Sequence, residues 1–134
     1  MDRLIQAGDV SNARSITTRA EELGAVAAAV GGGREAYDAV TARALGSLAV
    51  LVEYAAPLLR SDGVLVAWKG ARDAGEEAAG AEAALQLGMA VKEVLPVQPY
   101  PSSENRHLHV LRKVSPTPAG FPRRPGMARK RPLA

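Results

Sequence analysis

The chain of 134 residues contains no cysteine, few aromatic residues and no long apolar segment. Without cysteine there can be no disulfide, thiolate metal site or cysteine nucleophile. Aromatic residues make up only 4% of the chain, so a core must be built from Ala, Val and Leu. The longest apolar run, residues 49–59, is interrupted by Glu53 and is shorter than the roughly 18–20 residues that span a bilayer. No signal peptide is recognisable, and we therefore expect a soluble, cytoplasmic protein without membrane contact.

Charge and proline divide the chain into two parts. Residues 114–134 carry five basic groups and no acidic group, whereas residues 1–113 carry 12 basic and 14 acidic groups. We therefore expect a body at 1–113 and a basic, Pro-rich C-terminal tail at 114–134, in which the prolines exclude regular structure. Such a tail favours a polyanionic partner, nucleic acid first. A solvated, disordered end without any partner is an equally favoured alternative.

Hydrophobic patterning indicates a mixed sheet. It predicts five strands, at residues 14–18, 37–44, 64–69, 91–97 and 106–113. It predicts three helices between them, at residues 19–30, 47–59 and 73–87. Strand 37–44 is apolar at its centre, so we expect it to be buried on both faces. The order of elements predicts an α/β sheet that begins with parallel crossovers and ends in an antiparallel hairpin.

Charged residues follow the predicted strands at the edge where such sheets bind ligands. Glu21 could accept hydrogen bonds from a ribose or an adenine, although its spacing alone favours a water-facing carboxylate at a helix start. Arg43 closes a strand expected to be buried, so it needs a carboxylate ligand or an internal salt bridge, for example with Glu21. Lys69 occupies the same position on the next strand and could simply be exposed to solvent. Arg106 opens the last strand and could meet a phosphate.

Neither a metal site nor a catalytic side chain is predicted. His107 and His109 lie on one face of their strand, but two histidines without a nearby acidic pair make a poor zinc site. No Ser-His-Asp arrangement and no pair of carboxylates stands out. Any chemistry must therefore come from positioning a reactive ligand rather than from a side-chain nucleophile or base.

Six sequence blocks occur in a characteristic order. They are Arg19–Leu23, Tyr37–Ala44, Leu58–Gly63, Lys69-Gly70, Arg106–Val110 and Thr117–Gly126. Together they resemble the C-terminal half of the bacterial 16S rRNA (guanine-N7)-methyltransferases, the glucose-inhibited division protein B family. The resemblance covers nearly the whole chain from about Ser11 onward. It depends on the ordered set of blocks and on the Phe-Pro-Arg-Arg-Pro-Gly segment of the tail.

The resemblance implies a Rossmann-like, class I S-adenosylmethionine-dependent methyltransferase fold and methyl transfer to a guanine N7 of 16S rRNA in the small ribosomal subunit, by a monomer. It places Ala20 and Glu21 against the adenosine of S-adenosylmethionine, and Arg43 against the same cofactor. We therefore expect Glu21 and Arg43 to line one half of a common pocket. The residues expected to bind substrate RNA are Lys69, Arg106, Arg123 and Arg124. Guanine N7 has a free lone pair, so in-line positioning can replace a general base.

The resemblance also implies that a part of the fold is absent. Members of the family carry two further strands and a Gly-rich cofactor loop before the region that this chain matches. Strand 14–18 would then lose the hydrogen bonds of both neighbours, and the remaining sheet would have an exposed edge. We expect a fragment, a mis-assigned start codon or one piece of a split gene. Two alternatives to an active rRNA methyltransferase stay open: a non-catalytic RNA-binding remnant, and a methyltransferase with another substrate.

Overall fold

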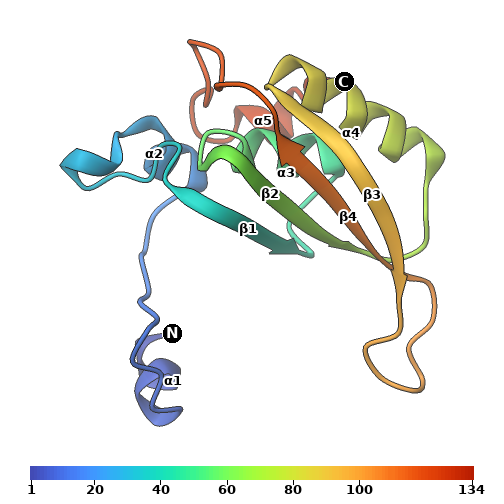
Figure 1. The fold of residues 1–134 in the computed structure, drawn as a ribbon, viewed down its shortest axis with the longest axis horizontal. Coiled ribbons are helices and arrows are strands. Elements are labelled where there is room, and N and C mark those ends of the chain that lie inside the picture. The colour runs from blue at the N-terminus through green and yellow to red at the C-terminus, as the bar shows by residue number, and fades with distance from the viewer.

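A computed structural model describes residues 1–134 and contains a four-stranded sheet in the order β1-β2-β4-β3 (Figure 1). The strands are β1 (Tyr37–Arg43), β2 (Leu59–Lys69), β3 (Met89–Val97) and β4 (Arg106–Lys113). The helices are α1 (Asp2–Ala7), α2 (Ala20–Ala25), α3 (Leu48–Ala55), α4 (Ala74–Gln86) and α5 (Met127–Lys130), with a 3₁₀ turn at Ala28–Val30. β1 and β2 are parallel, and β4 is antiparallel to both β2 and β3. Of the predicted parallel crossovers only the one between β1 and β2 is present, and the predicted antiparallel hairpin of β3 and β4 is confirmed.

The core lies between the sheet and α3 with α4. Seven of the eight residues of α3 are buried, and α3, α4 and α5 lie on the same side of the sheet (Figure 1). A Cβ atom on Gly80 of α4 would lie 2.6 Å from the Cβ of Leu48, so glycine at this position lets the two helices approach closely. The core is thus formed by close packing of small and aliphatic residues rather than by aromatic rings. None of the helices combines the length and hydrophobicity that a bilayer-spanning segment requires.

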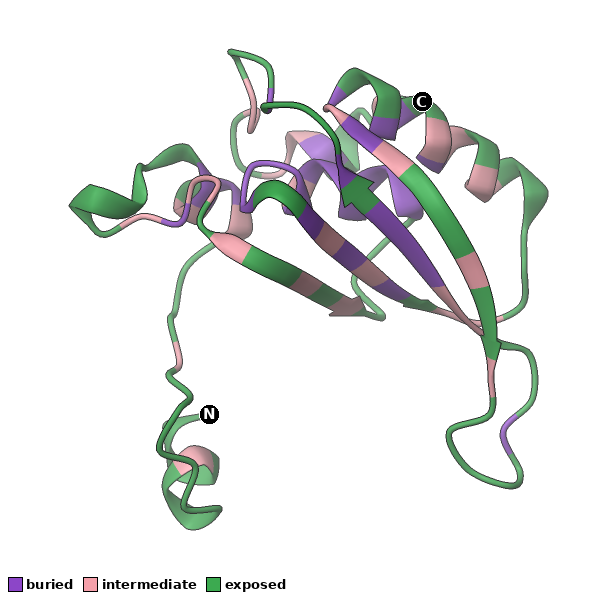
Figure 2. Cartoon of the chain, in the orientation of Figure 1, coloured by how far each residue is buried: buried purple, intermediate pink, exposed green.

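The opposite face of the sheet is open. Along β2, Leu65 and Ala67 are buried against the helices, whereas Val66 and Trp68 point to the other side and are partly exposed or exposed (Figure 2). This alternation follows from the two-residue period of a strand. The side chains on the open face are therefore accessible wherever no helix covers them.

Local sequence signals predicted the positions of α4 and β4 closely. Helix α4 begins where Asp73 accepts a hydrogen bond from the Glu76 amide at 2.8 Å, and it ends before Gly88, whose φ is +69°. β4 begins and ends at the residues expected from its pattern. Helix α3 stops at Ala55, earlier than expected, because Pro57 cannot continue it.

Three expectations about the N-terminal half are wrong. No residue of β1 is buried, because β1 is an edge strand that pairs only with β2. Residues 14–18 form no strand, since they connect α1 to α2 as an extended segment with no strand beside them (Figure 1). The helix expected at 19–30 breaks at Val26, because the chain folds back and the Val26 carbonyl accepts a hydrogen bond from the Arg34 amide at 3.0 Å.

The C-terminal segment, residues 114–134, is packed against the body, contrary to the expectation of a segment without regular structure. We call it the C-terminal clasp. It contains α5, its Thr117 and Ala128 are buried, and Phe121 and Leu133 pack against the core. Arg34 Nη1 donates a hydrogen bond to the Phe121 carbonyl at 2.7 Å. Prolines prevent long helices or ladders here, but they do not prevent apolar side chains from packing.

A buried polar network fixes the start of the clasp. The Lys113 ammonium is buried and donates hydrogen bonds to the Ala56 carbonyl at 2.5 Å and to the Thr117 hydroxyl. It lies 3.5 Å from Glu35 Oε1. Burial lowers the pKa of Lys113. Burial alone would raise the pKa of Glu35, but the Thr117 amide and the Lys113 ammonium together hold that pKa below its ordinary value.

Candidate functional site

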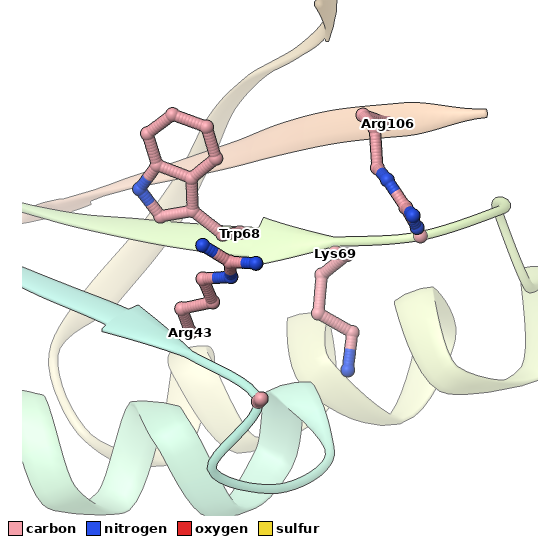
Figure 3. A pocket seen from close by; sticks show the side chains of 6 residues that line it. Arg43, Trp68, Lys69 and Arg106 are labelled. Atoms are coloured by element: carbon pink, nitrogen blue, oxygen red, sulfur yellow. The ribbon is translucent and has the colours of Figure 1, made fainter. Parts of the chain in front are cut away.

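Three of the predicted basic residues line one cavity of about 360 Å³ at the carboxyl ends of β1 and β2 (Figure 3). We call it the cation cavity, after the cationic side chains that line it. Its lining residues are Arg43, Ala44, Trp68, Lys69, Gly70 and Arg106. None of them is acidic, and neither Arg43 nor Arg106 forms a side-chain hydrogen bond or ion pair. Two guanidinium groups without partners beside a cavity create a site for anionic groups.

The register of the sheet explains this arrangement. Arg43 lies directly opposite Trp68 across the parallel pair β1–β2, and Trp68 lies opposite Leu108 of β4. Arg106 is two residues from Leu108 and therefore projects from the same face of the sheet. The expectation that Arg43 needs an internal partner fails, because β1 is exposed rather than buried.

Lys69 also borders the cavity but points to the other side of β2 (Figure 3). Its ammonium lies 2.5 Å from Glu76 Oε1 and donates a hydrogen bond to the Gly46 carbonyl at 3.1 Å. The same Glu76 oxygen accepts a hydrogen bond from the Leu48 amide at 2.9 Å. Lys69 therefore fixes the loop that connects β1 to α3, besides contributing its charge to the cavity.

Ala20 and Glu21 line a second cavity of about 480 Å³, which we call the Glu21 cavity. Its other lining residues are Thr18, Arg19, Leu45, Tyr54, Gly126 and Arg129. Glu21 is buried rather than facing water, and its Oε1 accepts a hydrogen bond from the Gly126 amide of the clasp at 2.9 Å. Its Oε2 forms no hydrogen bond within the chain.

Glu21 and Arg43 do not line a common cavity, and this part of the prediction is wrong. The turn after β1 lies between them: Arg43 and Ala44 face the cation cavity, and Leu45 faces the Glu21 cavity. Gly126 and Arg129 of the clasp fill the space beside Glu21. Ala44 has a φ of +53°, a conformation that costs about 1 kcal/mol for a residue with a Cβ. Such strained residues often occur at functional sites.

The two arginines expected to bind RNA from the tail have different surroundings. Arg123 binds Glu53 through both Nε, at 2.7 Å, and Nη2, and it also donates to the Arg131 carbonyl. Glu53 raises the pKa of Arg123 further above its already high value. Arg124 is exposed and its side chain has no hydrogen-bond partner. Of the two, only Arg124 is free to bind another molecule.

A cluster that sequence reasoning missed lies under the sheet near α4. Glu77 receives two hydrogen bonds from Arg72, at 2.8 and 2.7 Å, and its Oε1 lies 3.1 Å from His109 Nε2. The hydrogen bonds from Arg72, and after them the one with His109, lower the pKa of Glu77 to about 2. The second ring nitrogen of His109 is buried without a partner. The sequence pattern indicated His107 and His109 as a pair on one strand, but it gave no sign of an acidic partner on a helix.

The Glu77 cluster predicts a specific pH dependence of stability. Because the pKa of Glu77 is lower in the folded chain than in the unfolded chain, its contribution is present above about pH 4.5 and is lost as the pH falls toward about 2. We expect Glu77→Gln to lower the urea midpoint at pH 7 and to leave it unchanged at pH 2. Urea unfolding at several pH values measures this difference. A constant difference between the two proteins would contradict the assignment.

The parallel pair β1–β2 with a cavity at its carboxyl ends, together with the antiparallel strands β3 and β4, defines a mixed α/β protein of the kind expected for a Rossmann-like methyltransferase fold. Comparison with protein families gives the particular family. Residues 1–108 match the family model described as GidB, rRNA small subunit methyltransferase G. The chain belongs to this family, and the resemblance inferred from the six sequence blocks is confirmed.

Individual relatives agree with the family match. The chain is 50% identical over 101 residues to ribosomal RNA small subunit methyltransferase G of Chloroflexus aggregans, covering 75% of this chain and 42% of the relative. It is 44% identical over 124 residues to the protein of the same name from Deinococcus radiodurans, covering 92% and 47%. For that of Roseiflexus castenholzii the identity is 40% over 133 residues, covering 99% and 55%. The chain thus spans about half the length of the curated relatives it matches.

Proposed function

We propose that this chain provides the RNA-binding and part of the cofactor-binding surface of a cytoplasmic, monomeric methyltransferase that transfers a methyl group from S-adenosylmethionine to a guanine N7 of 16S rRNA. Membership of the family supports the reaction class. One structural observation carries the proposal: a cavity bearing Arg43 and Arg106 lies at the carboxyl ends of parallel strands, separated only by the Ala44 turn from the cavity of Glu21.

The Glu21 cavity fits the nucleoside part of the cofactor. A carboxylate oxygen without a hydrogen bond can accept from ribose hydroxyls or from an amino group. Ala20, the first residue of α2, lines the same cavity. When bound, the cofactor supplies a methyl group on a sulfonium. Arg43 lines the cation cavity on the other side of the turn, and from there it would contact either the cofactor or the RNA.

The cation cavity fits the RNA. Arg43 and Arg106 would bind phosphate oxygens, Lys69 would add positive potential, and Arg124 would extend this surface onto the clasp. Arg123 we assign to holding the clasp, because Glu53 occupies its guanidinium. Since guanine N7 needs no deprotonation, these residues would act by fixing the base in line with the methyl group, a positioning effect worth up to roughly 7–11 kcal/mol.

Cofactor binding provides a direct test on this chain. We expect Glu21→Gln to weaken the affinity for S-adenosylmethionine about 5- to 15-fold, because an ionic hydrogen bond of about 1.5–3 kcal/mol is replaced by a neutral one of about 0.5–1.5 kcal/mol. Glu22→Gln is the matched control, since Glu22 is the next residue of α2 and is exposed, with hydrogen bonds to Thr18 and Arg19. Isothermal titration calorimetry measures both. Equal effects of the two substitutions would remove Glu21 from the cofactor site.

Methyl transfer tests the reaction itself. Tritium from labelled cofactor should appear in 16S rRNA of undermethylated small subunits as 7-methylguanine. Because the chain spans about half the length of its relatives, the assay is run with and without the part of a relative that the chain does not match. Label in any other nucleotide would contradict the substrate assignment. RNA binding without measurable cofactor affinity would favour the alternative of a non-catalytic RNA-binding protein.

A further inference from the structure

We propose that Trp68 is a stacking platform for one unpaired base of single-stranded RNA, held there by the nearby Arg43 and Arg106. This inference rests on the proposed function, because it specifies how the RNA would occupy the cation cavity. Trp68 matches none of the sequence blocks that carry the family resemblance. Its role follows from its exposure and its neighbours.

Trp68 is unusually accessible for the only tryptophan of the chain. It is 39% exposed, although it lies between residues of β2 that are buried or half-buried. Its indole N–H forms no hydrogen bond within the protein. The indole is the largest aromatic ring of the chain and would remove the most apolar surface from water in the core, yet it borders the cation cavity instead. The exposed face of the ring is therefore available to a ligand.

The nearby charges make the ring part of a nucleic-acid site rather than an isolated apolar spot. Arg43 pairs with Trp68 across the parallel strands β1 and β2, and neighbouring strands lie about 4.8 Å apart. Arg106 comes from β4, two residues from Leu108, which pairs with Trp68. In Figure 3 Arg106 lies beyond Arg43 as seen from the indole. Two guanidinium groups without partners thus lie on the same side of the indole. Aromatic faces combined with a positive groove are the arrangement that binds single-stranded nucleic acid.

The cavity is large enough for a base. The Arg106 guanidinium lies over Gly70, since a Cβ atom on this glycine would be in van der Waals contact with Arg106 Nη1 at 3.6 Å. A cavity of about 360 Å³ lies within the range of small-molecule sites. In duplex RNA the base faces are covered by their neighbours, so stacking on Trp68 requires an unpaired base. The occupant is therefore a single strand, with its base on Trp68 and its phosphates toward the two arginines.

The test uses the full chain, in which Trp68 is the only source of tryptophan fluorescence. A seven-nucleotide RNA with one guanine among uridines is titrated, followed by the same RNA with an abasic site in place of the guanine. Fluorescence anisotropy of a label at the RNA end gives the affinity. We expect the guanine-bearing RNA to quench Trp68 and to bind roughly 5- to 150-fold more tightly than the abasic RNA.

Substitutions separate stacking from charge. Trp68→Leu should abolish the difference between the two RNAs and leave the affinity for the abasic RNA unchanged, while Trp68→Phe should keep part of the difference. Unchanged circular dichroism and Tm of Trp68→Leu would show that the fold is intact. Equal binding of both RNAs to the wild-type protein, equal quenching by duplex RNA, or no RNA binding at all would overturn the inference.

Failure of the stacking role of Trp68 can be distinguished from failure of the proposed methyltransferase function. Methyl transfer to guanine N7 with no base-dependent binding would refute only the stacking role of Trp68. Base-dependent quenching by a chain that never binds S-adenosylmethionine, alone or with the complementary part of a relative, would support the stacking role and refute the methyltransferase function.

Discussion

Replacing Arg123 by alanine is expected to lower the free energy of unfolding by about 3–5 kcal/mol, because it leaves a buried carboxylate without its counter-charge. Glu53 lies in the middle of α3 with a side chain that is only 1% exposed, and Arg123 is its only ionic partner. The same guanidinium donates to the Arg131 carbonyl at 2.8 Å and so joins the middle of the clasp to its C-terminal part. Urea unfolding at pH 7 measures the loss.

Arg124→Ala is the matched control for Arg123→Ala. The two substitutions remove the same charge from adjacent residues, but the Arg124 side chain has no partner, so its removal should change stability by less than about 0.5 kcal/mol. A double replacement of Glu53 and Arg123 by methionine should recover most of the stability, because no unpaired charge then stays buried. If Arg123→Ala and Arg124→Ala proved equally mild, the clasp would not be held by this ion pair.

The ion pair also connects the clasp to the candidate cofactor site. Arg123 and Gly126 belong to the same short segment, and the Gly126 amide donates to Glu21 at 2.9 Å. Arg129 of α5 donates to the Leu45 carbonyl at 2.7 Å, at the turn that separates the two cavities. The basic residues of the clasp therefore serve in part to position Glu21 and the Ala44 turn. Loss of the Arg123–Glu53 pair should weaken cofactor binding even under conditions where the body stays folded.

The sequence predicted those features whose causes are local. Asp73 and Gly88 mark the two ends of α4 by their capping chemistry, and the pattern of β4 locates that strand. Arg43 and Lys69, the last residues of β1 and β2, were expected at one edge because the carboxyl ends of parallel strands meet there, although Arg43 was expected to share its pocket with Glu21. Arg106 joins them because β4 runs antiparallel and begins at that edge.

Features that depend on distant partners were not predictable in the same way. The burial of β1 depends on what pairs with its free edge and covers its second face, and neither is encoded in residues 37–44. The position of Glu21 depends on Gly126, which is 105 residues away. One signal was present: a glutamate inside the apolar segment 49–59 requires a buried partner. It indicated that some basic residue packs on α3, but not that Arg123 is the one.

Removal of both unpaired arginines of the cation cavity is expected to have the largest effect on RNA binding. We expect Arg43→Ala and Arg106→Ala each to weaken the affinity for single-stranded RNA about 10-fold, since each removes an ionic hydrogen bond to phosphate. The double variant should bind roughly 100-fold more weakly if the two arginines act independently. A plot of log affinity against log salt concentration should also have a slope smaller in magnitude by about 1.4 for the double variant. This is about 0.7 for each of the two phosphates that are no longer neutralised.

Arg112→Ala is the control that separates a located site from a general charge effect. Arg112 is on the same strand as Arg106 and on the same face, but it lies at the other end of the sheet and pairs with Asp62 at 2.8 Å. Its removal changes the net charge equally and should alter RNA affinity less than about 2-fold, because exposed charges more than about 10 Å away are screened at 0.1 M salt. If Arg112→Ala weakened binding as much as Arg106→Ala, RNA would be attracted by overall charge alone. A selective effect of Arg43→Ala and Arg106→Ala would instead locate the RNA at the carboxyl ends of β1 and β2, beside the turn that leads to Glu21.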